Sequence, residues 1–567
     1  MKNITLARIE QARHFFNDKK RIRNFTIITW LITFIVYGLT IWLYIKFVLN
    51  IKDLSTIIFL SIATFMLLLL VPDCLAHTIT WIYHKFKMKD LGFNNVKILS
   101  KFAKLPKEMP SVALIHLCAN DFIPECMDKC LKVKYMKLDF YLCDDSTKEE
   151  CIKTVDDYVK IRKCQLHRRP NEHKKKYPTK GGNWHYFLHH IGYKYDYIVF
   201  TDSGTILQPD FIEKNIRLFY AGVENLAIVQ GYHCAYAKFS LWEKIMYKWD
   251  ETFHRHTVGS LNNIYSAAFC NGFAFIVKTK CLMEIPINKV NVYTCDQAIS
   301  FFFWKKYKSL YSPLSVAMKI RSLTFFSNIM QLAKWCSTDW RSIVSPKNHT
   351  LPILSTAWGF WWFLSTWGRW ISIFFINIVF PVMLVFGQIN PYLIITNVWV
   401  LLPSLLFLLS FGILTIWGMF YDVKSLLSSI LFLLFYLTVG NYLKLILVFV
   451  AFSKILHIKI NYHVTEKNNF VEKSWKTTFK LIWKYNLCIM LFIIFLMTSY
   501  FVWTYKTSHF DLITFILFCG VISQLVNAMI MPFVLNTFSY LKLPKSRGGV
   551  YNYKKWIIDD FKYLKDK

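Results

Sequence analysis

The chain has 567 residues, of which 54% are hydrophobic and 18% aromatic, with a mean hydropathy of +0.32 and a formal net charge of +33. This composition is too apolar for an ordinary soluble enzyme and is typical of a polytopic membrane protein that carries a polar domain. The Lys and Arg residues cluster beside long apolar runs, as on the cytoplasmic face of a membrane, and no nucleic-acid-binding signature accompanies them. We therefore expect the lipid bilayer, and no nucleic acid, as a partner.

Two apolar segments near the N-terminus, 26–48 and 55–76, are each long enough to cross a bilayer as a helix. Basic residues precede the first segment and follow the second, which places both flanks in the cytoplasm. The first segment lacks a small-residue cleavage site, so we expect no cleavable signal peptide. Residues 1–89 are predicted to form a cytoplasmic N-terminus and two transmembrane helices.

The next 250 or so residues contain no spanning segment, and apolar segments then resume at 368–387, 392–419, 425–457, 482–504 and 511–536. Basic residues flank 425–457 on both sides, which favours an interfacial or re-entrant helix pair over a crossing. The prediction is a cytoplasmic domain at 90–345, four transmembrane helices within 346–541 and a basic cytoplasmic tail at 542–567. Both termini would be cytoplasmic in a multi-pass protein of the plasma membrane.

Eleven of the fourteen Cys residues lie in this polar domain at irregular spacings. Cys126 and Cys130 have the spacing of a metal half-site, but no second pair with matching His or Cys follows them. We favour reduced cytosolic thiols that pack as small hydrophobic side chains.

The polar domain begins with a strand, a helix and a second strand. Residues 111–121 form an apolar run that ends at Asn120, residues 121–132 have helical spacing, and the run 136–150 passes through Asp144 and Asp145. Ligands of open parallel sheets bind at the carboxyl ends of the strands, where these acids lie. Alternatively, one of the two acids only caps the following helix.

A basic stretch follows, much of which we expect to be a solvated loop. It ends at Lys180-Gly181-Gly182-Asn183, where the glycines would let the backbone approach a ligand and the lysine would attract phosphate. A third strand, YDYIVF, leads into TDSGT and ends at Asp202.

In this order, the strand ends, the KGGN turn and TDSGT resemble family 2 glycosyltransferases. The resemblance implies a GT-A type nucleotide-sugar domain, a mixed and mostly parallel sheet with helices on both faces, inserted in an α-helical polytopic membrane domain. It implies a nucleotide-sugar site that includes Asn120, Asp145, Lys180 and Gly181, with Asp145 on the nucleobase.

The resemblance further implies that Asp202 carries Mg²⁺ or Mn²⁺ on the diphosphate. Gly204 stands where many glycosyltransferases have a second acid, so Asp202 would be the single firm metal ligand, with His233 as a candidate further donor.

Two later segments resemble the acceptor side of the same family. Residues 269–285 resemble the glycine-containing strand that shapes the acceptor pocket, which implies acceptor contacts by Asn271 and Gly272. The segment VYTCDQ matches the family's Thr-Glu-Asp, with Cys295 in place of Glu and Asp296 as the general base. The alternative for Asp296 is a helix N-cap.

Two segments resemble membrane-integrated processive synthases such as those of cellulose, hyaluronan and chitin. QLAKW resembles their Gln-x-x-Arg-Trp, which implies that Gln331 and Lys334 bind the nucleotide-sugar and that Trp335 stacks on the acceptor. YHVTEK, in a predicted gating loop at 459–478, resembles the cellulose synthase loop, with matches at Tyr462, Val464, Thr465 and Lys467. The alternative is a polar connector.

The sequence thus predicts an inverting glycosyltransferase that polymerises a hexose from a UDP-sugar into a cell-surface or capsular polysaccharide and moves the growing polysaccharide acceptor across the membrane. A non-processive transferase that loads one sugar onto a lipid carrier remains possible. So does a transporter with a catalytically dead nucleotide-binding domain. The five Trp residues within 356–370 belong either to an interfacial aromatic belt or to a sugar path.

Overall fold

The computed structural model describes residues 2–48, most of 50–71, 91–235, 260–290, 295–304, 306–320, residue 331 and a few positions between 491 and 505. The gating loop, Lys334 and Trp335 fall outside the described residues, as do the predicted C-terminal spans apart from a few positions of 482–504, and those predictions stay untested.

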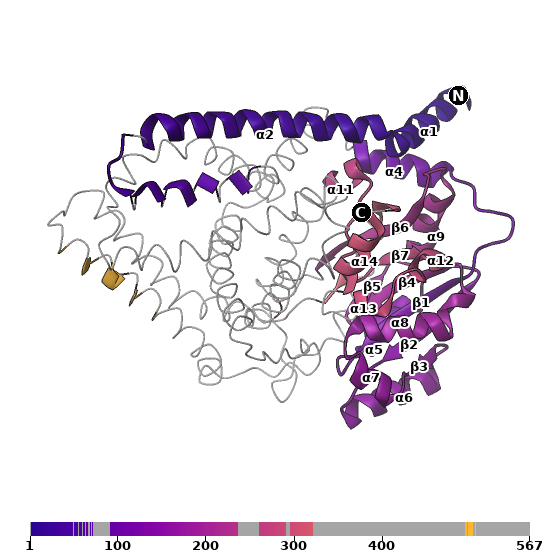
Figure 1. The fold of residues 1–567 in the computed structure, drawn as a ribbon. Helices are drawn as coiled ribbons and strands as arrows, with labels where there is room; N and C mark the ends of the chain where they lie inside the picture. Colours follow the sequence, from indigo (N-terminus) through magenta and orange to yellow (C-terminus); the bar gives the residue numbers. More distant parts are fainter. Residues whose placement is uncertain are drawn as a thin grey trace, which may run out of the picture.

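An eight-stranded mixed sheet forms the centre of the polar domain, in the order β3-β2-β1-β4-β7-β6-β8-β5 (Figure 1). The strands β3, β2, β1 and β4 are parallel, β7 is antiparallel to both β4 and β6, β8 is parallel to β6, and β5 is antiparallel to β8. The strand bounds are Val112–Cys118 (β1), Leu138–Asp144 (β2), Gln165–His167 (β3), Tyr197–Asp202 (β4), Thr205–Leu207 (β5), Leu226–Ala235 (β6), Phe275–Lys278 (β7) and Lys308–Lys319 (β8).

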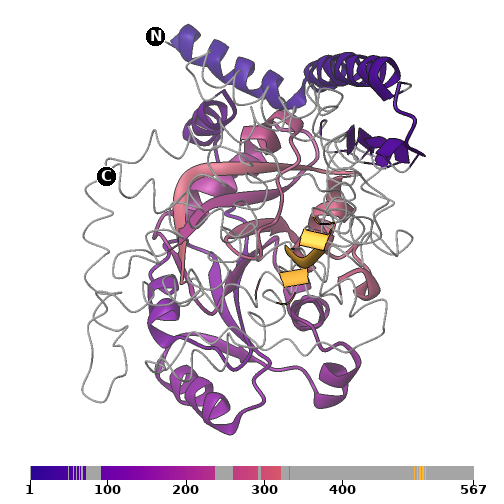
Figure 2. The same ribbon diagram turned by 90° about the vertical axis from the view of Figure 1, so that its left-hand side faces the viewer.

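Helices cover both faces of this sheet, as the alternation of side chains along β1 requires (Figure 2). Val112 and Leu114 point into a core that α1, α4, α5, α6 and α9 share, whereas Ala113 and Ile115 point into a core with α8, α12, α13 and α14. The predicted mixed sheet with helices on both faces is confirmed. The helix bounds are Lys2–Asn17 (α1), Lys19–Val48 (α2), Leu91–Phe102 (α4), Pro124–Cys130 (α5), Glu149–Ile161 (α6), Asn171–Lys176 (α7), Lys180–His190 (α8), Phe211–Ile216 (α9), Ser260–Tyr265 (α11), Thr279–Leu282 (α12), Ile287–Val290 (α13) and Cys295–Trp304 (α14), with 3-10 turns at Gly192–Lys194 (η1) and Arg217–Tyr220 (η2).

The basic stretch before α8 is more ordered than its composition indicated. It contains the edge strand β3, the short helix α7 and a fully enclosed arginine, Arg169, which is 3% exposed. The stretch is therefore not a continuous loop, although many of its residues are exposed, and the charge of Arg169 is matched by a carboxylate inside the domain.

The long helix α2 contains the predicted span 26–48 and extends away from the sheet (Figure 1). Among the described residues it is the one helix that is long and apolar enough to cross a membrane. Large apolar side chains along it, including Leu31, Phe34 and Trp42, are more than half exposed. The polytopic membrane domain as a whole stays a prediction.

The helix α1 attaches this long helix to the polar domain. Ala12 and Phe16 are buried in the core beside α4. Arg13 Nε donates to the carbonyl of Ala221 at 2.7 Å, and Asn17 Nδ2 donates to the carbonyl of Gly222 at 2.9 Å. The N-terminal helix is thus part of the polar domain's core rather than a separate basic arm.

Candidate functional site

The polar residues that the sequence singled out at the first, second and third strand ends lie along one edge of the parallel half of the sheet. Asp144 is the register partner of Cys118 in β1, and Asp202 is the partner of Leu117 from the other side. The chain therefore places the ends of β2, β1 and β4 next to one another, at the carboxyl edge where parallel sheets bind ligands.

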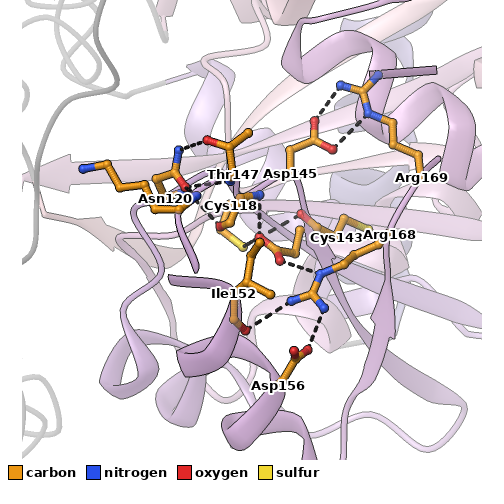
Figure 3. A network of polar contacts seen from close by, with 12 residues as sticks. Cys118, Asn120, Cys143, Asp145, Thr147, Ile152, Asp156, Arg168 and Arg169 are labelled. Carbon is orange, nitrogen blue, oxygen red and sulfur yellow. Dashed lines mark hydrogen bonds and ion pairs between the residues drawn. The ribbon is translucent and has the colours of Figure 1, made fainter. Parts of the chain in front are cut away.

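Asn120 closes the end of β1 over the start of α6 (Figure 3). It has a left-handed backbone, with φ of 61°, which Asn tolerates better than most residues. Its Oδ1 accepts from the backbone N–H groups of Thr147 and Lys148, at 2.8 and 2.9 Å, and its Nδ2 donates to Thr147 Oγ1. Asn120 thus fixes the two residues that precede α6, and neither Asp144 nor Asp145 caps the helix, since its N-cap position, Lys148, has no side-chain cap hydrogen bond.

The two acids after β2 bind two consecutive arginines (Figure 3). The fully buried Asp144 accepts from Arg168 Nε at 2.7 Å, and the Arg168 guanidinium also binds Asp156. Asp145 forms a bidentate pair with Arg169, with Nε–Oδ1 of 2.9 Å and Nη2–Oδ2 of 2.6 Å. A planar guanidinium suits this two-point contact.

The Arg169 guanidinium also ties Asp145 to the start of α8. Its Nη1 donates to the carbonyl of Tyr177 at 2.6 Å, and its Nη2 donates to that of Thr179 at 3.3 Å. Thr179 is the N-cap of α8, whose first residue is Lys180. The nucleobase contact predicted for Asp145 would therefore form on a carboxylate whose orientation is already fixed.

The glycines of KGGN allow close packing inside the protein. A Cβ on Gly181 would lie 1.7 Å from the carbonyl oxygen of Val290 in α13, and a Cβ on Gly182 would lie 2.4 Å from that of Tyr177. These positions need glycine because neighbouring backbone approaches α8. The predicted contact of Gly181 with the nucleotide stays a prediction.

Asp202 is held between two lysines that come from distant parts of the chain. Lys180 Nζ, from α8, donates to Oδ1 and also to the carbonyl of Gly272 at 2.6 Å. Lys319 Nζ, from the end of β8, donates to Oδ2 at 2.6 Å. Burial alone would lower the pKa of Lys180, but the carboxylate of Asp202 outweighs this and the pKa is raised, so the ammonium is firmly charged.

The backbone fixes Lys319 in this position. Thr205 and Lys319 are register partners in the β5–β8 pair, and the N–H of Ile320 donates to the carbonyl of Gly204 at 2.9 Å. Gly204, which stands where a second acid was expected, therefore binds the backbone just after Lys319 and holds this end of β8 in place.

Asp296 lies in the first turn of α14, next to the same cluster. A Cβ on Gly272 would lie 3.1 Å from Asp296 Oδ2, and Gly272 has a φ of +87°, so both space and backbone favour glycine there. Burial raises the pKa of Asp296, and the nearby charge of Lys180 partly offsets this rise. The pKa of this carboxyl is thus moved in the direction that suits a general base.

A buried glutamine that the sequence did not single out holds the turn before β7. Gln230 Oε1 accepts from the N–H of Asn271 at 2.9 Å, and its Nε2 donates to the carbonyls of Gly231 and Phe273. This turn carries Gly272, whose carbonyl binds Lys180. The acceptor contacts predicted for Asn271 and Gly272 would therefore form on a turn fixed from inside the sheet.

The residues around Asp202 do not fit the divalent cation that the sequence predicted. Both carboxylate oxygens bind ammonium groups, and Gly204 offers no side-chain ligand. Within the described ranges, no group of three or more His, Cys, Asp and Glu side chains could hold a metal ion. His233 is buried and packs on Phe273, with 4.5 Å between the ring centroids. Mg²⁺ and Mn²⁺ prefer several oxygen ligands, and adjacent ammonium groups repel them.

Gln331 is described and partly buried, whereas the other two residues of its motif lie outside the described part of the chain. Its predicted contact with the nucleotide-sugar stays a prediction.

One family model matches most of the domain that carries this site. Residues 111–285 match the family model for glycosyl transferase family 2, which includes the site positions from Asn120 to Gly272 and leaves out Asp296, Lys319, Gln331 and the predicted site residues that follow them. No curated protein sequence matches the chain significantly.

Solved structures with a similar arrangement include glucosyl-3-phosphoglycerate synthase from Mycobacterium tuberculosis in complex with Mn²⁺, UDP and glucosyl-3-phosphoglycerate. It is 11% identical, with a TM-score of 0.27, over 40% of this chain and 76% of that one. The S. aureus TarS structure is 13% identical, with a TM-score of 0.26, over 47% of this chain and 43% of that one.

Proposed function

We propose that the chain is an inverting family 2 glycosyltransferase that transfers a hexose from a nucleotide-sugar, with UDP as the nucleotide, to a growing polysaccharide at the cytoplasmic face of a membrane. The observation that carries this proposal is the single cluster of Asp202, Lys180, Gly272 and Asp296 at the carboxyl edge of a sheet that matches the family. These residues are far apart in the sequence, and a purely structural α/β domain does not require their convergence.

The arrangement supports direct displacement at the anomeric carbon. Asp296 takes the proton of the acceptor hydroxyl, whose oxygen forms the new glycosidic bond. The bond from the anomeric carbon to the diphosphate oxygen breaks on the opposite side, and its electron pair leaves with the nucleoside diphosphate. A carboxyl whose pKa is raised by burial is a stronger base than an ordinary Asp once it is ionised.

The polymerising and membrane parts of the proposal rest on other features. The resemblance of QLAKW and YHVTEK to processive synthases supports chain extension. The exposed apolar side chains of α2 support insertion into lipid. Tyr37 donates to the carbonyl of Leu68 at 2.6 Å, and Tyr44 is hydrogen-bonded to Ser61. The segment that contains Ser61 and Leu68 therefore runs antiparallel to α2, as in a helical hairpin that crosses a membrane and returns.

The test uses the full chain purified in detergent with panels of UDP-sugars and GDP-sugars, with EDTA and separately with Mg²⁺ or Mn²⁺. We expect release of UDP from one or a few donors together with a high-molecular-weight product. Asp296→Asn should lower the rate of release by roughly 10²–10⁴-fold. Asp157→Asn, which alters an exposed carboxylate paired with Lys160 on α6, is the matched control and should keep full activity.

Equal and negligible turnover of every donor by the wild type and Asp296→Asn would contradict an enzymatic function and favour a transporter with an inactive domain. A product with one sugar in the lipid fraction would retain the transferase but replace the polymerase with the loading of a lipid carrier.

A further inference from the structure

The pair of lysines on Asp202 is the strongest feature that the family resemblance leaves unexplained. Lys319 lies 117 residues beyond Asp202 in the sequence and outside the segment that matches the family. The side chains of Lys180, Lys319 and Asp202 are 29%, 12% and 17% exposed, so the cluster is partly enclosed yet open at the carboxyl edge.

Charge counting distinguishes this cluster from a metal site. A divalent cation on two carboxylates has a net charge of zero before the donor arrives. Here one carboxylate faces two ammonium groups, which leaves one positive charge. Two lysines therefore supply the same two positive charges as Mg²⁺, and the absence of a second acid at Gly204 leaves the cluster one unit more positive than such a metal site, which favours an anionic diphosphate.

The geometry is also suited to a diphosphate. An ammonium group has three N–H donors, and Lys180 uses two of them, on Asp202 and on the carbonyl of Gly272. Lys319 lies over the Phe273 ring, with Nζ 4.2 Å from the centroid, which restricts its position. Asp202 thus sets the spacing of two cations at the edge where the donor would bind.

We propose that Lys180 and Lys319 bind the diphosphate of the donor directly and take the place of the divalent cation, with Asp202 as the residue that positions them. As the bond from the anomeric carbon to the diphosphate breaks, negative charge grows on the departing oxygen, and the ammonium groups stabilise it. This inference rests on the proposed function and adds Lys319 as a diphosphate-binding residue.

The test measures binding of UDP and GDP to the full chain in detergent by calorimetry, in EDTA and then with Mn²⁺. We expect the Kd of the nucleotide that binds to be the same in both. Lys319→Gln should weaken binding about tenfold or more in both conditions, as for the loss of one charge-assisted hydrogen bond. Lys319→Arg should restore most of the affinity because it retains the charge.

Lys308→Gln is the matched control, since it removes a lysine from the opposite end of the same strand, where its Nζ binds Asn17. It should leave the Kd unchanged. Thermal unfolding of each variant shows whether it is folded. If Lys319→Gln does not fold, the affinity of Lys319→Arg tests the role of the charge.

Two outcomes would overturn the inference, and they are distinguishable. In the first, binding disappears in EDTA, returns with Mn²⁺ and does not differ between wild type and Lys319→Gln. This result would show that a metal ion, and not Lys319, binds the diphosphate, while the proposed function stands. If neither UDP nor GDP binds the wild type, in EDTA or with Mn²⁺, the proposed function and the inference are both contradicted.

Discussion

At the scale of single residues, Asp296 shows how position alters the chemistry of a carboxyl group. It is packed against Gly272 and near Lys180, and burial dominates the effect on its pKa. An Asp in water has a pKa of about 3.9, and the shift of Asp296 is upward from there.

The direction of this shift predicts the pH dependence of transfer. A general base acts only when ionised, so kcat/KM should fall as the pH falls through the raised pKa of Asp296, and this acid limb should lie above the range of an ordinary Asp. The measurement is the rate of UDP release against pH at low donor concentration. Asp296→Asn should lower the rate by roughly 10²–10⁴-fold while UDP binding persists, and loss of binding instead would assign Asp296 a structural role.

The Asp145–Arg169 pair predicts a large cost for removing one buried partner. Arg169→Met leaves Asp145 without its two-point contact and removes two donors from backbone carbonyls. We expect a loss of about 3 kcal/mol in the free energy of unfolding, measured as a fall in Tm of the full chain in detergent.

The control is Arg162→Met, which breaks an ion pair with Asp128 at the surface and should leave the Tm nearly unchanged. Similar Tm values for the two variants would show that the buried pair adds no more stability than an exposed one.

At the scale of elements, the placement of α8 depends on contacts that cannot be predicted from its composition. The start of α8 passes so close to α13 that the Cβ of any other residue at Gly181 would meet a backbone oxygen. We predict that Gly181→Ala lowers the stability by at least about 2 kcal/mol, because one of the two helices must move.

Gly38→Ala in α2 is the comparison, since a Cβ added at Gly38 would have no other atom within 4 Å and alanine favours helices. Thermal unfolding should separate the two variants, and equal Tm values would show that the α8–α13 contact is easily displaced.

The strands β1, β2 and β4 could be predicted from the sequence because each is a short buried run that ends in polar residues. Their acids share an edge for the same reason, since parallel strands end together. Arg169 was not identified, because a buried arginine within a basic stretch looks like a solvated one until its partner is known. Lys319 could not be identified at all, since its contact with Asp202 depends on the pairing of β5 with β8.

At the scale of the whole molecule, the polar domain and the long apolar helix meet through α1. Asn17 makes three contacts there: it donates to the carbonyl of Gly222 and accepts from the N–H of Glu224 and from Lys308 Nζ, at 2.9, 3.0 and 2.9 Å. One side chain therefore joins the end of α1 to two separate segments of the domain.

Replacing Asn17 should loosen this attachment. We predict that Asn17→Ala costs about 1–3 kcal/mol in the attachment of α1, in line with the loss of these hydrogen bonds, and that trypsin then cleaves faster at Lys19 and Lys20. Asn50→Ala, which removes a single local contact with the carbonyl of Lys46, should not change the cleavage rate there. Equal cleavage rates of the two variants would mean that the buried side chains of α1 are enough to attach it to the polar domain without Asn17.

The joint between α1 and α2 is one residue, Asp18, whose carboxylate accepts from the N–H of Lys20 at 2.8 Å. The 30 residues of α2 are about 45 Å long. A change of about 10° at this joint would therefore move the far end of the helix by roughly 8 Å, from the 1.5 Å rise per residue. If the contact of Phe25 with Tyr265 instead holds α2 to the domain, a rotation of the domain carries the helix with it, and a small rotation of the sheet becomes a large displacement in the proposed bilayer. Bilayers of different thickness would then present the catalytic edge at different angles to the membrane plane.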